Sequence, residues 1–154
     1  MAKKTYPTPK KYTIQNKEKY IGNTSQVILR SSWEKKLARF LDLNPAVLKW
    51  NSEDIRIPYF SQADGKMRNY HIDFFAQIKN KNGEIKKYLI EVKPYDQTQP
   101  PKKGYRKKHE TYLNECHTYQ VNQDKWQAAM KWAERNDMIF VLMTEYELGL
   151  KKKD

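Results

Sequence analysis

Residues 68–78 alternate between apolar and polar or aromatic side chains, which is the period of a β-strand. One face of this stretch carries Ile72, Phe74, Ala76 and Ile78, and the other carries His71, Asp73, Phe75 and Gln77. Residues 86–92 alternate again, and Pro94 ends that run because it has no amide hydrogen for the ladder. The turn residues between the two stretches, Asn80-Lys81-Asn82-Gly83, predict that the strands form a hairpin.

The length of the turn decides which residues of the two strands face each other. With a two-residue loop at Asn82-Gly83, Asp73 and Glu91 would point to opposite faces of the sheet. With a three-residue loop whose glycine adopts the left-handed conformation of a bulge, Asp73 pairs with Glu91. We predict the three-residue loop, which brings the two carboxylates together.

Three residues of this hairpin, Asp73, Glu91 and Lys93, suit metal-assisted hydrolysis of a phosphodiester. Carboxylates opposed across two strands have Cβ atoms about 5 Å apart, which destabilises a sheet unless a positive charge lies between them. A divalent cation supplies that charge and generates hydroxide from bound water at neutral pH. Lys93 lies roughly 7 Å further along the same face, where it can steady the attacking water. An ordinary hairpin with a solvent-facing polar side would carry the same residues, so the pattern permits both interpretations.

A helical pattern precedes this hairpin. Apolar residues at helical spacing predict a helix from Ser31 or Ser32 to Leu43, ended by Asn44-Pro45. Glu34, beside the apolar stripe, has two interpretations. It can form a capping box by bonding the amide of Ser31, or it can be a third carboxylate at the rim of the site, and the two roles are compatible. The apolar stripe itself consists of Trp33, Leu37, Phe40 and Leu41.

The remaining patterns complete a mixed α/β arrangement. A strand at 55–60, a turn at 63–66 and the two strands of the hairpin predict a three-stranded antiparallel meander. A short helix at 111–119 and a second helix from Asn122 or Asp124 to Arg135 follow. The apolar run 138–144 predicts a strand covered on both faces and added parallel to the sheet. The core side of the second helix is expected to carry Trp126, Ala129, Met130 and Ala133.

The composition indicates one soluble domain. The chain has 154 residues, is 38% hydrophobic, and its longest apolar run, 139–143, is too short to cross a bilayer. Its start, Met1 to Lys4, is followed by polar residues, so no secretory signal is expected. The single cysteine, Cys116, excludes an internal disulfide and fits a reducing compartment. His109, Cys116 and His117 lie close in sequence, but one cysteine and three histidines cannot form a usual closed zinc site without carboxylates.

The net charge of +12 is concentrated in two tails and one loop. Residues 1–20 carry six lysines against one glutamate, residues 99–110 carry five basic residues against one glutamate, and residues 151–154 carry three lysines against one aspartate. Basic arms of this kind suit a polyanionic partner such as DNA, although solubilising tails have the same composition. The candidate phosphate contacts are Lys10 and Lys11 in the first tail and Lys102, Lys103, Arg106, Lys107 and Lys108 in the loop.

These patterns divide the chain into a flexible basic arm (1–24), a folded domain (25–150) and a basic tail (151–154). The arm lacks periodicity and is expected to order on a partner, with Tyr12 and Tyr20 either stacking on bases or packing onto the body. The loop 95–109 is too long and too basic for a plain connector, so we expect it beside the catalytic face. Lys125, near the expected start of the second helix, can reach a phosphate or remain solvated.

The order helix, three-stranded meander, helix, strand over about residues 30–145 resembles the PD-(D/E)xK nuclease superfamily. The family's motif residues match Glu34, Asp73, Glu91 and Lys93 on the corresponding elements, while Ile72 replaces the usual proline. The resemblance implies an α/β (α+β), restriction-endonuclease-like core with a mixed sheet flanked by helices. The pattern R-S-x-x-E at 30–34, with H-I-D-F and E-V-K-P, resembles the nuclease subunits of cut-and-paste transposons. The chain's size, its basic arms and residues 91–103 resemble the head-completion nucleases of T4-type tailed phages.

The resemblance also implies a function, in which Asp73, Glu91 and the carbonyl of Val92 bind Mg²⁺ or Mn²⁺, Lys93 assists the attacking water and Glu34 supports the site. The implied substrate is double-stranded DNA, the implied partners are phage head, portal or neck proteins, and the implied locations are the host cytoplasm during assembly and the virion head or neck. A DNA-binding assembly factor on a nuclease scaffold is the alternative, but the intact Asp, Glu and Lys favour a metal-dependent endonuclease. Further supporting residues are expected at Arg30, His71, Gln97 and Lys125.

Overall fold

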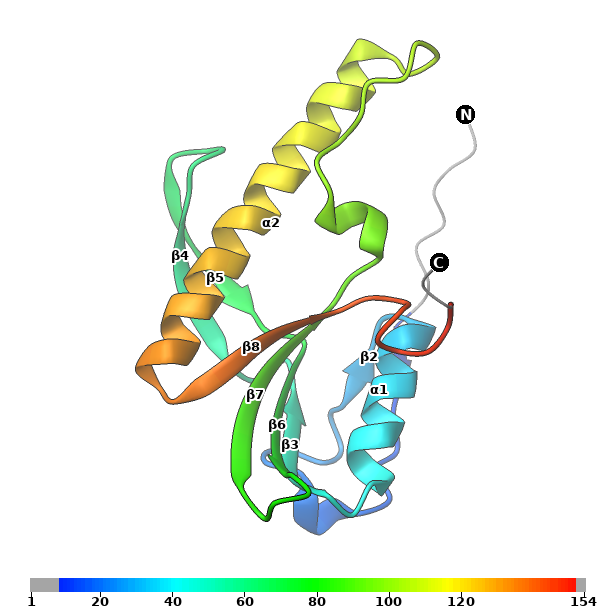
Figure 1. The fold of residues 1–154 in the computed structure, drawn as a ribbon, viewed down its shortest axis with the longest axis vertical. Coiled ribbons are helices and arrows are strands. Elements are labelled where there is room, and N and C mark those ends of the chain that lie inside the picture. The colour runs from blue at the N-terminus through cyan, green and yellow to red at the C-terminus, as the bar shows by residue number, and fades with distance from the viewer. Residues whose placement is uncertain (1–8, 152–154) are drawn as a thin grey trace.

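The computed structural model describes residues 9–151 (Figure 1). Its central sheet has four strands in the order β3 (Val47–Ser52), β6 (Phe74–Lys79), β7 (Ile85–Val92) and β8 (Met138–Met143). The first three are antiparallel neighbours, and β8 runs parallel to β7 as predicted. A separate hairpin is formed by β4 (Arg56–Ser61) and β5 (Lys66–His71). The other elements are β1 (Lys10–Lys11), η1 (Lys17–Lys19), β2 (Ile28–Leu29), α1 (Ser32–Leu43), η2 (Tyr95–Thr98) and α2 (His109–Arg135).

One helix covers each face of the central sheet. Neighbouring residues of a strand point to opposite sides, so Phe74 belongs to a hydrophobic cluster with Leu37 and Leu41 of α1, whereas Phe75 belongs to another with Trp126 of α2. The resulting layers of helix, sheet and helix agree with the predicted α/β class. Within residues 9–151, no helix combines the length and the apolar character needed to span a membrane.

The β6–β7 hairpin adopts the predicted register. Phe74 pairs with Ile90, so the next residues outward, Asp73 and Glu91, lie opposite each other. Gly83 in the turn has a φ of +81°, which is the left-handed conformation that favours glycine. The local turn chemistry therefore decides which two carboxylates meet.

The strand predicted over 68–78 is two strands, and the predicted meander is wrong in this respect. β5 ends at His71 and pairs with β4, whereas β6 begins at Phe74 and pairs with β3 and β7. The amide of Ile72 still donates to the carbonyl of Ile55, so the chain leaves the hairpin after that residue. Alternation gives the period of a strand but does not identify its partner. The meander therefore consists of β3, β6 and β7, and the predicted strand at 55–60 belongs to a hairpin inserted between β3 and β6.

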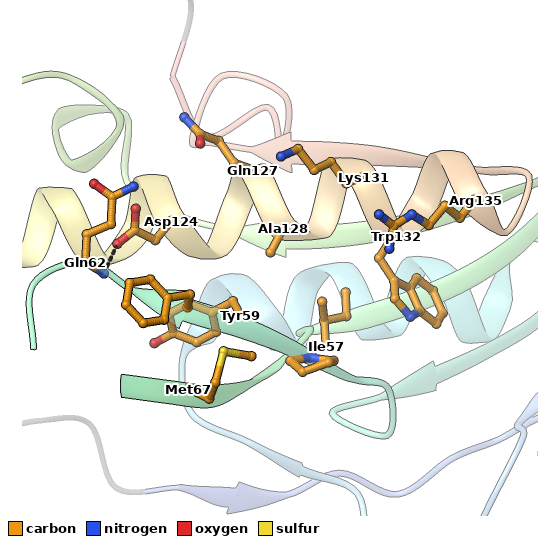
Figure 2. A pocket seen from close by; sticks show the side chains of 12 residues that line it. Ile57, Tyr59, Gln62, Met67, Asp124, Gln127, Ala128, Lys131, Trp132 and Arg135 are labelled. Carbon is orange, nitrogen blue, oxygen red and sulfur yellow. Dashed lines mark hydrogen bonds between the residues drawn. The ribbon is translucent and has the colours of Figure 1, made fainter. Parts of the chain in front are cut away.

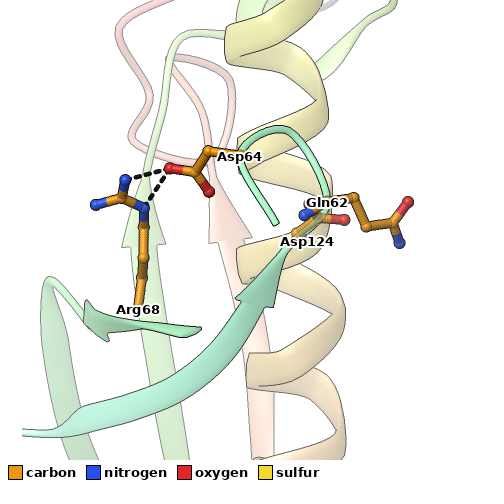
Figure 3. Close-up of polar contacts among 4 residues, drawn as sticks. All are labelled: Gln62, Asp64, Arg68 and Asp124. Atoms are coloured by element: carbon orange, nitrogen blue, oxygen red, sulfur yellow. Dashed lines mark hydrogen bonds and ion pairs between the residues drawn. The ribbon is translucent and has the colours of Figure 1, made fainter. Parts of the chain in front are cut away.

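Residues 109–135 form one continuous helix, which corrects the prediction of two. Asn122 and Asp124, predicted as caps, are buried inside it. Asp124 accepts hydrogen bonds from the amide of Gln62 (2.9 Å) and the side chain of Gln120 (2.9 Å), and the first of these ties the hairpin to α2 (Figure 3). Between the hairpin and α2 lies a groove of about 320 Å³ whose lining includes Tyr59, Met67 and Trp132 and none of the candidate site residues (Figure 2).

Three apolar residues are more exposed than predicted. Met130 of α2 is 51% exposed, Phe40 of α1 is 50% exposed and Ile139 of β8 is 44% exposed. β8 is an edge strand of the sheet and none of its residues is fully buried, so it is not covered on both faces as expected. On α1 the buried stripe includes Ala38 and Asp42 in place of Phe40, because the helix face that meets the sheet is shifted around the axis.

The segment 9–24 packs onto the body, which differs from the flexible arm expected there. The buried carboxylate of Asp42 accepts hydrogen bonds from the hydroxyl of Tyr12 (3.0 Å) and from the amides of Gln15 (2.8 Å) and Asn16 (2.9 Å). The ring of Tyr20 meets a buried tryptophan edge to face, with centroids 4.9 Å apart. Both tyrosines therefore pack onto the body. The outer parts of the expected arm and tail, 1–8 and 152–154, lie outside the described residues.

Candidate active site

Asp73 and Glu91 occupy neighbouring positions at one end of the β6–β7 hairpin. Asp73 lies in the two-residue break between β5 and β6, and Glu91 is the penultimate residue of β7. The amide of Val92 donates to Oδ2 of Asp73 at 2.9 Å, which holds this carboxylate against β7. Glu91 is buried, with 7% of its surface exposed. The structure thus brings together the two carboxylates that the predicted register pairs.

The environment of the two carboxylates opposes their ionisation. Burial raises the pKa of Asp73 well above its usual value, the charge of Glu91 raises it further, and the Val92 amide opposes the shift. Burial also raises the pKa of Glu91, opposed by Tyr70 and by the ammonium of Lys93. Two buried acids that share one space titrate as a pair. Without a metal, the repulsion between the two carboxylates is relieved when one of them binds a proton. A bound cation would relieve the same repulsion.

Two lysines from different elements approach this pair. Lys93 follows β7, where its amide donates to the carbonyl of Met143 at 2.9 Å. Lys125 comes from α2 and is half-buried, with its ammonium 5.5 Å from the centre of the Tyr70 ring. Burial and the charge of Lys93 lower the pKa of Lys125, while Glu91 and then Asp73 raise it. Two carboxylates and two ammonium groups therefore act on one another in a partly buried space.

Glu34 lies in the first turn of α1 and performs the capping role. Its amide donates to Oγ of Ser31 at 3.1 Å, and its Oε2 accepts from the amide of Arg30 at 2.9 Å, one residue earlier than predicted. Burial raises the pKa of Glu34, while the charges of Arg30 and Lys93 lower it. Arg30 forms an ion pair with Glu53 at 3.3 Å. Glu34 is thus both a helix cap and an electrostatic neighbour of Lys93.

Other candidate residues lie outside this cluster. His71 is exposed on β5, and Gln97 is exposed on η2. The basic loop runs from η2 to the N-terminal end of α2 (Figure 1). From His109 to Lys125 the helix spans about 24 Å, so the basic end of the loop, residues 102–108, stands at the far end of α2, whereas the start of the loop directly follows Lys93 and Pro94. Lys107 of this loop forms an ion pair with Glu115 at 2.7 Å. The other basic candidates are Lys102, Lys103, Arg106 and Lys108 in the loop and Lys10 and Lys11 on β1.

Tyr70 and Trp126 were not identified as site residues from the sequence. The hydroxyl of Tyr70 lies close enough to Glu91, Asp73 and Trp126 for each of them to affect its pKa, which burial raises. Alternation over 68–78 had placed Tyr70 on the face opposite Asp73, and the break between β5 and β6 removes that relation. Trp126 carried only the signal of a core residue. Neither role was visible without the tertiary structure.

The donor atoms present fit a small divalent cation. Within residues 9–151, no group of three or more His, Cys, Asp and Glu side chains forms a ready metal site. Mg²⁺ is nevertheless commonly bound by one or two carboxylates with water and substrate oxygens completing its shell. Asp73 and Glu91 supply two hard oxygen ligands whose mutual repulsion a cation would relieve. The residues therefore suit Mg²⁺ or Mn²⁺ better than the softer metals that prefer sulfur.

The three-layer fold, with its carboxylates at the end of the antiparallel hairpin, defines a restriction-endonuclease-like nuclease domain. A family model described as the N-terminal domain of TnsA-like endonucleases matches residues 44–145, and the chain belongs to this family. The matched span contains Asp73, Glu91 and Lys93, whereas Glu34 precedes it. A similar protein is the head completion nuclease of Enterobacteria phage T4, which is 38% identical over 138 residues, covering 88% of this chain and 89% of the phage T4 protein.

Proposed function

We propose that the chain is a metal-dependent DNA endonuclease that acts in the completion of DNA-filled phage heads. The observation that carries this proposal is the pair of the half-buried Asp73 and the buried Glu91, which lie opposite each other with raised pKa values and are approached by two lysines. Such a pair is costly for a protein unless it binds a cation. Family membership supports the nuclease activity, and the name of the phage T4 relative supports the role in head completion.

The site residues divide the work between binding and charge stabilisation. Asp73, Glu91 and the carbonyl of Val92 would hold Mg²⁺ or Mn²⁺, which when bound polarises the phosphate and lowers the pKa of its water. The Val92 amide keeps Asp73 in place for this role. Lys93 steadies the attacking water or the charge that develops on the phosphate oxygens. Glu34 attracts the ammonium of Lys93 from the first turn of α1.

Lys125 supplies a second positive charge to the same phosphate. In the metal-free site, the ammonium groups of Lys93 and Lys125 face Asp73 and Glu91. With a divalent cation held by Asp73 and Glu91, both lysines would be free to attract an incoming anion. The contact of Lys125 with the Tyr70 ring keeps its ammonium at the site while the partners change.

The basic loop and Lys10 and Lys11 would bind the phosphate backbone without reading sequence. The loop lies about 24 Å along α2 from Lys125. At 3.4 Å per base pair, it would contact double-stranded DNA roughly seven base pairs from the cleaved bond. We place the activity in the host cytoplasm during assembly and at the virion head or neck, where head, portal or neck proteins would be its partners.

The test is cleavage of plasmid DNA in Mg²⁺ or Mn²⁺ by the wild type and by Asp73→Asn, Lys93→Ala and Lys87→Ala. Lys87 lies on β7, the strand that Lys93 directly follows, is exposed and serves as the matched control. We expect the wild type and Lys87→Ala to cut, and Asp73→Asn and Lys93→Ala to bind DNA in EDTA without cutting. If all four proteins bind and none cuts in any metal, the chain is a DNA-binding assembly factor on a nuclease scaffold.

A further inference from the structure

Three buried polar atoms lie close to one another at the Glu91 carboxylate. They are the hydroxyl of Tyr70 from β5, Nε1 of Trp126 from α2 and Oε2 of Glu91 from β7. Each is buried and finds no hydrogen-bond partner within residues 9–151. Burying such an atom without a partner costs about 1–3 kcal/mol. Three of them in one place call for a structural or functional reason.

The donor and acceptor properties of the three groups are complementary. An indole nitrogen only donates, an ionised carboxylate only accepts, and a phenol hydroxyl does both. The Tyr70 hydroxyl is a neighbour of both other groups, since Glu91 and Trp126 both act on its pKa. The indole can therefore donate to the hydroxyl, which in turn can donate to the carboxylate.

We propose that Trp126, Tyr70 and Glu91 form a chain of hydrogen bonds that orients the Glu91 carboxylate as it binds its cation. Tyr70 and Trp126 are then positioning residues, because they act on the reaction through Glu91. This inference rests on the proposed function of the site. Groups that bond the outer oxygens of metal ligands commonly change metal affinity or activity by 10–100-fold when they are removed.

The same chain of hydrogen bonds gives the β4–β5 hairpin a role. The hairpin lies outside the central sheet, and its bond from Gln62 to Asp124 fixes it to α2. Tyr70 is the residue through which the hairpin reaches Glu91. Because Trp126 lies two residues beyond Asp124 on the same helix, the hairpin and α2 jointly set the position of the hydroxyl.

The test compares Tyr70→Phe with Tyr59→Phe by Mn²⁺ binding, measured by electron paramagnetic resonance without DNA. Both changes remove one hydroxyl from the same buried cluster, but Tyr59 is on β4 and its hydroxyl is not one of the buried atoms without a partner. Phenylalanine at position 70 keeps a ring for Lys125. We expect Tyr70→Phe to bind Mn²⁺ about 10-fold more weakly and to shift the pH profile of plasmid cleavage, and Tyr59→Phe to match the wild type in both.

A second comparison tests the order of the chain. Because Trp126 acts through Tyr70, the double variant Tyr70→Phe with Trp126→Phe should bind Mn²⁺ no more weakly than Tyr70→Phe alone. Thermal melting confirms that each variant is folded. Three results would overturn this inference but leave the proposed function intact. They are wild-type Mn²⁺ affinity in Tyr70→Phe, an equal loss of affinity in Tyr59→Phe, and additive losses of affinity in the double variant. A wild type that neither binds Mn²⁺ nor cuts DNA would overturn the proposed function and this inference together.

Discussion

Asp73→Asn should stabilise the metal-free protein, although Asp73 is half-buried and hydrogen-bonded. In the wild type, Asp73 and Glu91 are opposed across the hairpin, and their Cβ atoms are about 5 Å apart. Two full charges at that distance repel by about 3 kcal/mol at an effective dielectric constant of ~20. The asparagine side-chain oxygen can still accept from the Val92 amide, so the repulsion is removed and the hydrogen bond is kept. The wild type can avoid part of the repulsion by binding a proton, so we expect a gain of about 1–3 kcal/mol at pH 8.

The pH dependence of this effect has a definite sign. The folded-state pKa values of Asp73 and Glu91 are raised, so the folded protein binds more protons than the unfolded chain. Their stabilising contribution is complete below the ordinary carboxyl pKa of about 4 and is lost as the pH rises through the raised values. The difference between Asp73→Asn and the wild type should therefore grow from pH 5 to pH 8.

Urea denaturation in EDTA at several pH values measures this difference, and Asp42→Asn is the matched control. Asp42 is fully buried, but three donors, from Tyr12, Gln15 and Asn16, bond its carboxylate. An amide in its place turns one acceptor into a donor, so Asp42→Asn should lose about 2 kcal/mol of stability. A loss of stability in Asp73→Asn at every pH, or a gain in Asp42→Asn, would refute the reasoning.

Three further outcomes can be measured. Gly83→Ala should cost about 1–2 kcal/mol in urea denaturation, because its φ is +81° and the new Cβ would gain only an ordinary contact with the Lys79 side chain at 3.9 Å; an unchanged midpoint would contradict this. The double variant Lys102→Ala with Lys103→Ala should lower the salt dependence of DNA binding by up to about two ions. Its cleavage rate at saturating DNA should not change. An unchanged slope of log affinity against log salt concentration would show that these lysines do not contact DNA. Lys125→Met should cut DNA at least about 10-fold more slowly than the wild type. It should bind Mn²⁺ as tightly as the wild type or more tightly, because an ammonium that repels the cation is gone. Weaker Mn²⁺ binding would contradict this role of Lys125.

The parts of the fold that depend on neighbouring residues were predictable from the sequence. The turn before Gly83 set the hairpin register, and the register alone places Asp73 opposite Glu91. The capping pattern at Ser31 set the start of α1. Each of these signals lies within five residues of the feature that it determines, so the local sequence carries the necessary information.

The features that the sequence did not predict depend on partners far along the chain. Asp124 has the chemistry of a helix cap, but it lies within α2 and its carboxylate bonds the amide of Gln62, which is 62 residues away. Segment 9–24 lacks periodicity because only Lys10–Lys11 form a ladder, while the carboxylate of Asp42 bonds the amides of Gln15 and Asn16. Tyr70 comes close to Glu91 because the chain passes from one sheet to the other between β5 and β6. The alternation of side chains continues through this break, so the sequence pattern does not reveal it.

The position of the β4–β5 hairpin in the chain allows evolution to change the outer surface of the protein independently of the alignment of the two acids. It is inserted between β3 and β6, while the alignment of the two acids is set by a turn on the other side of β6. A longer or shorter hairpin at the turn between Ser61 and Lys66, away from Tyr70, would reshape the surface beside α2. It would not move Asp73 relative to Glu91. Homologous nucleases could therefore acquire different contacts with DNA or with other proteins at this hairpin while the same reaction geometry is inherited.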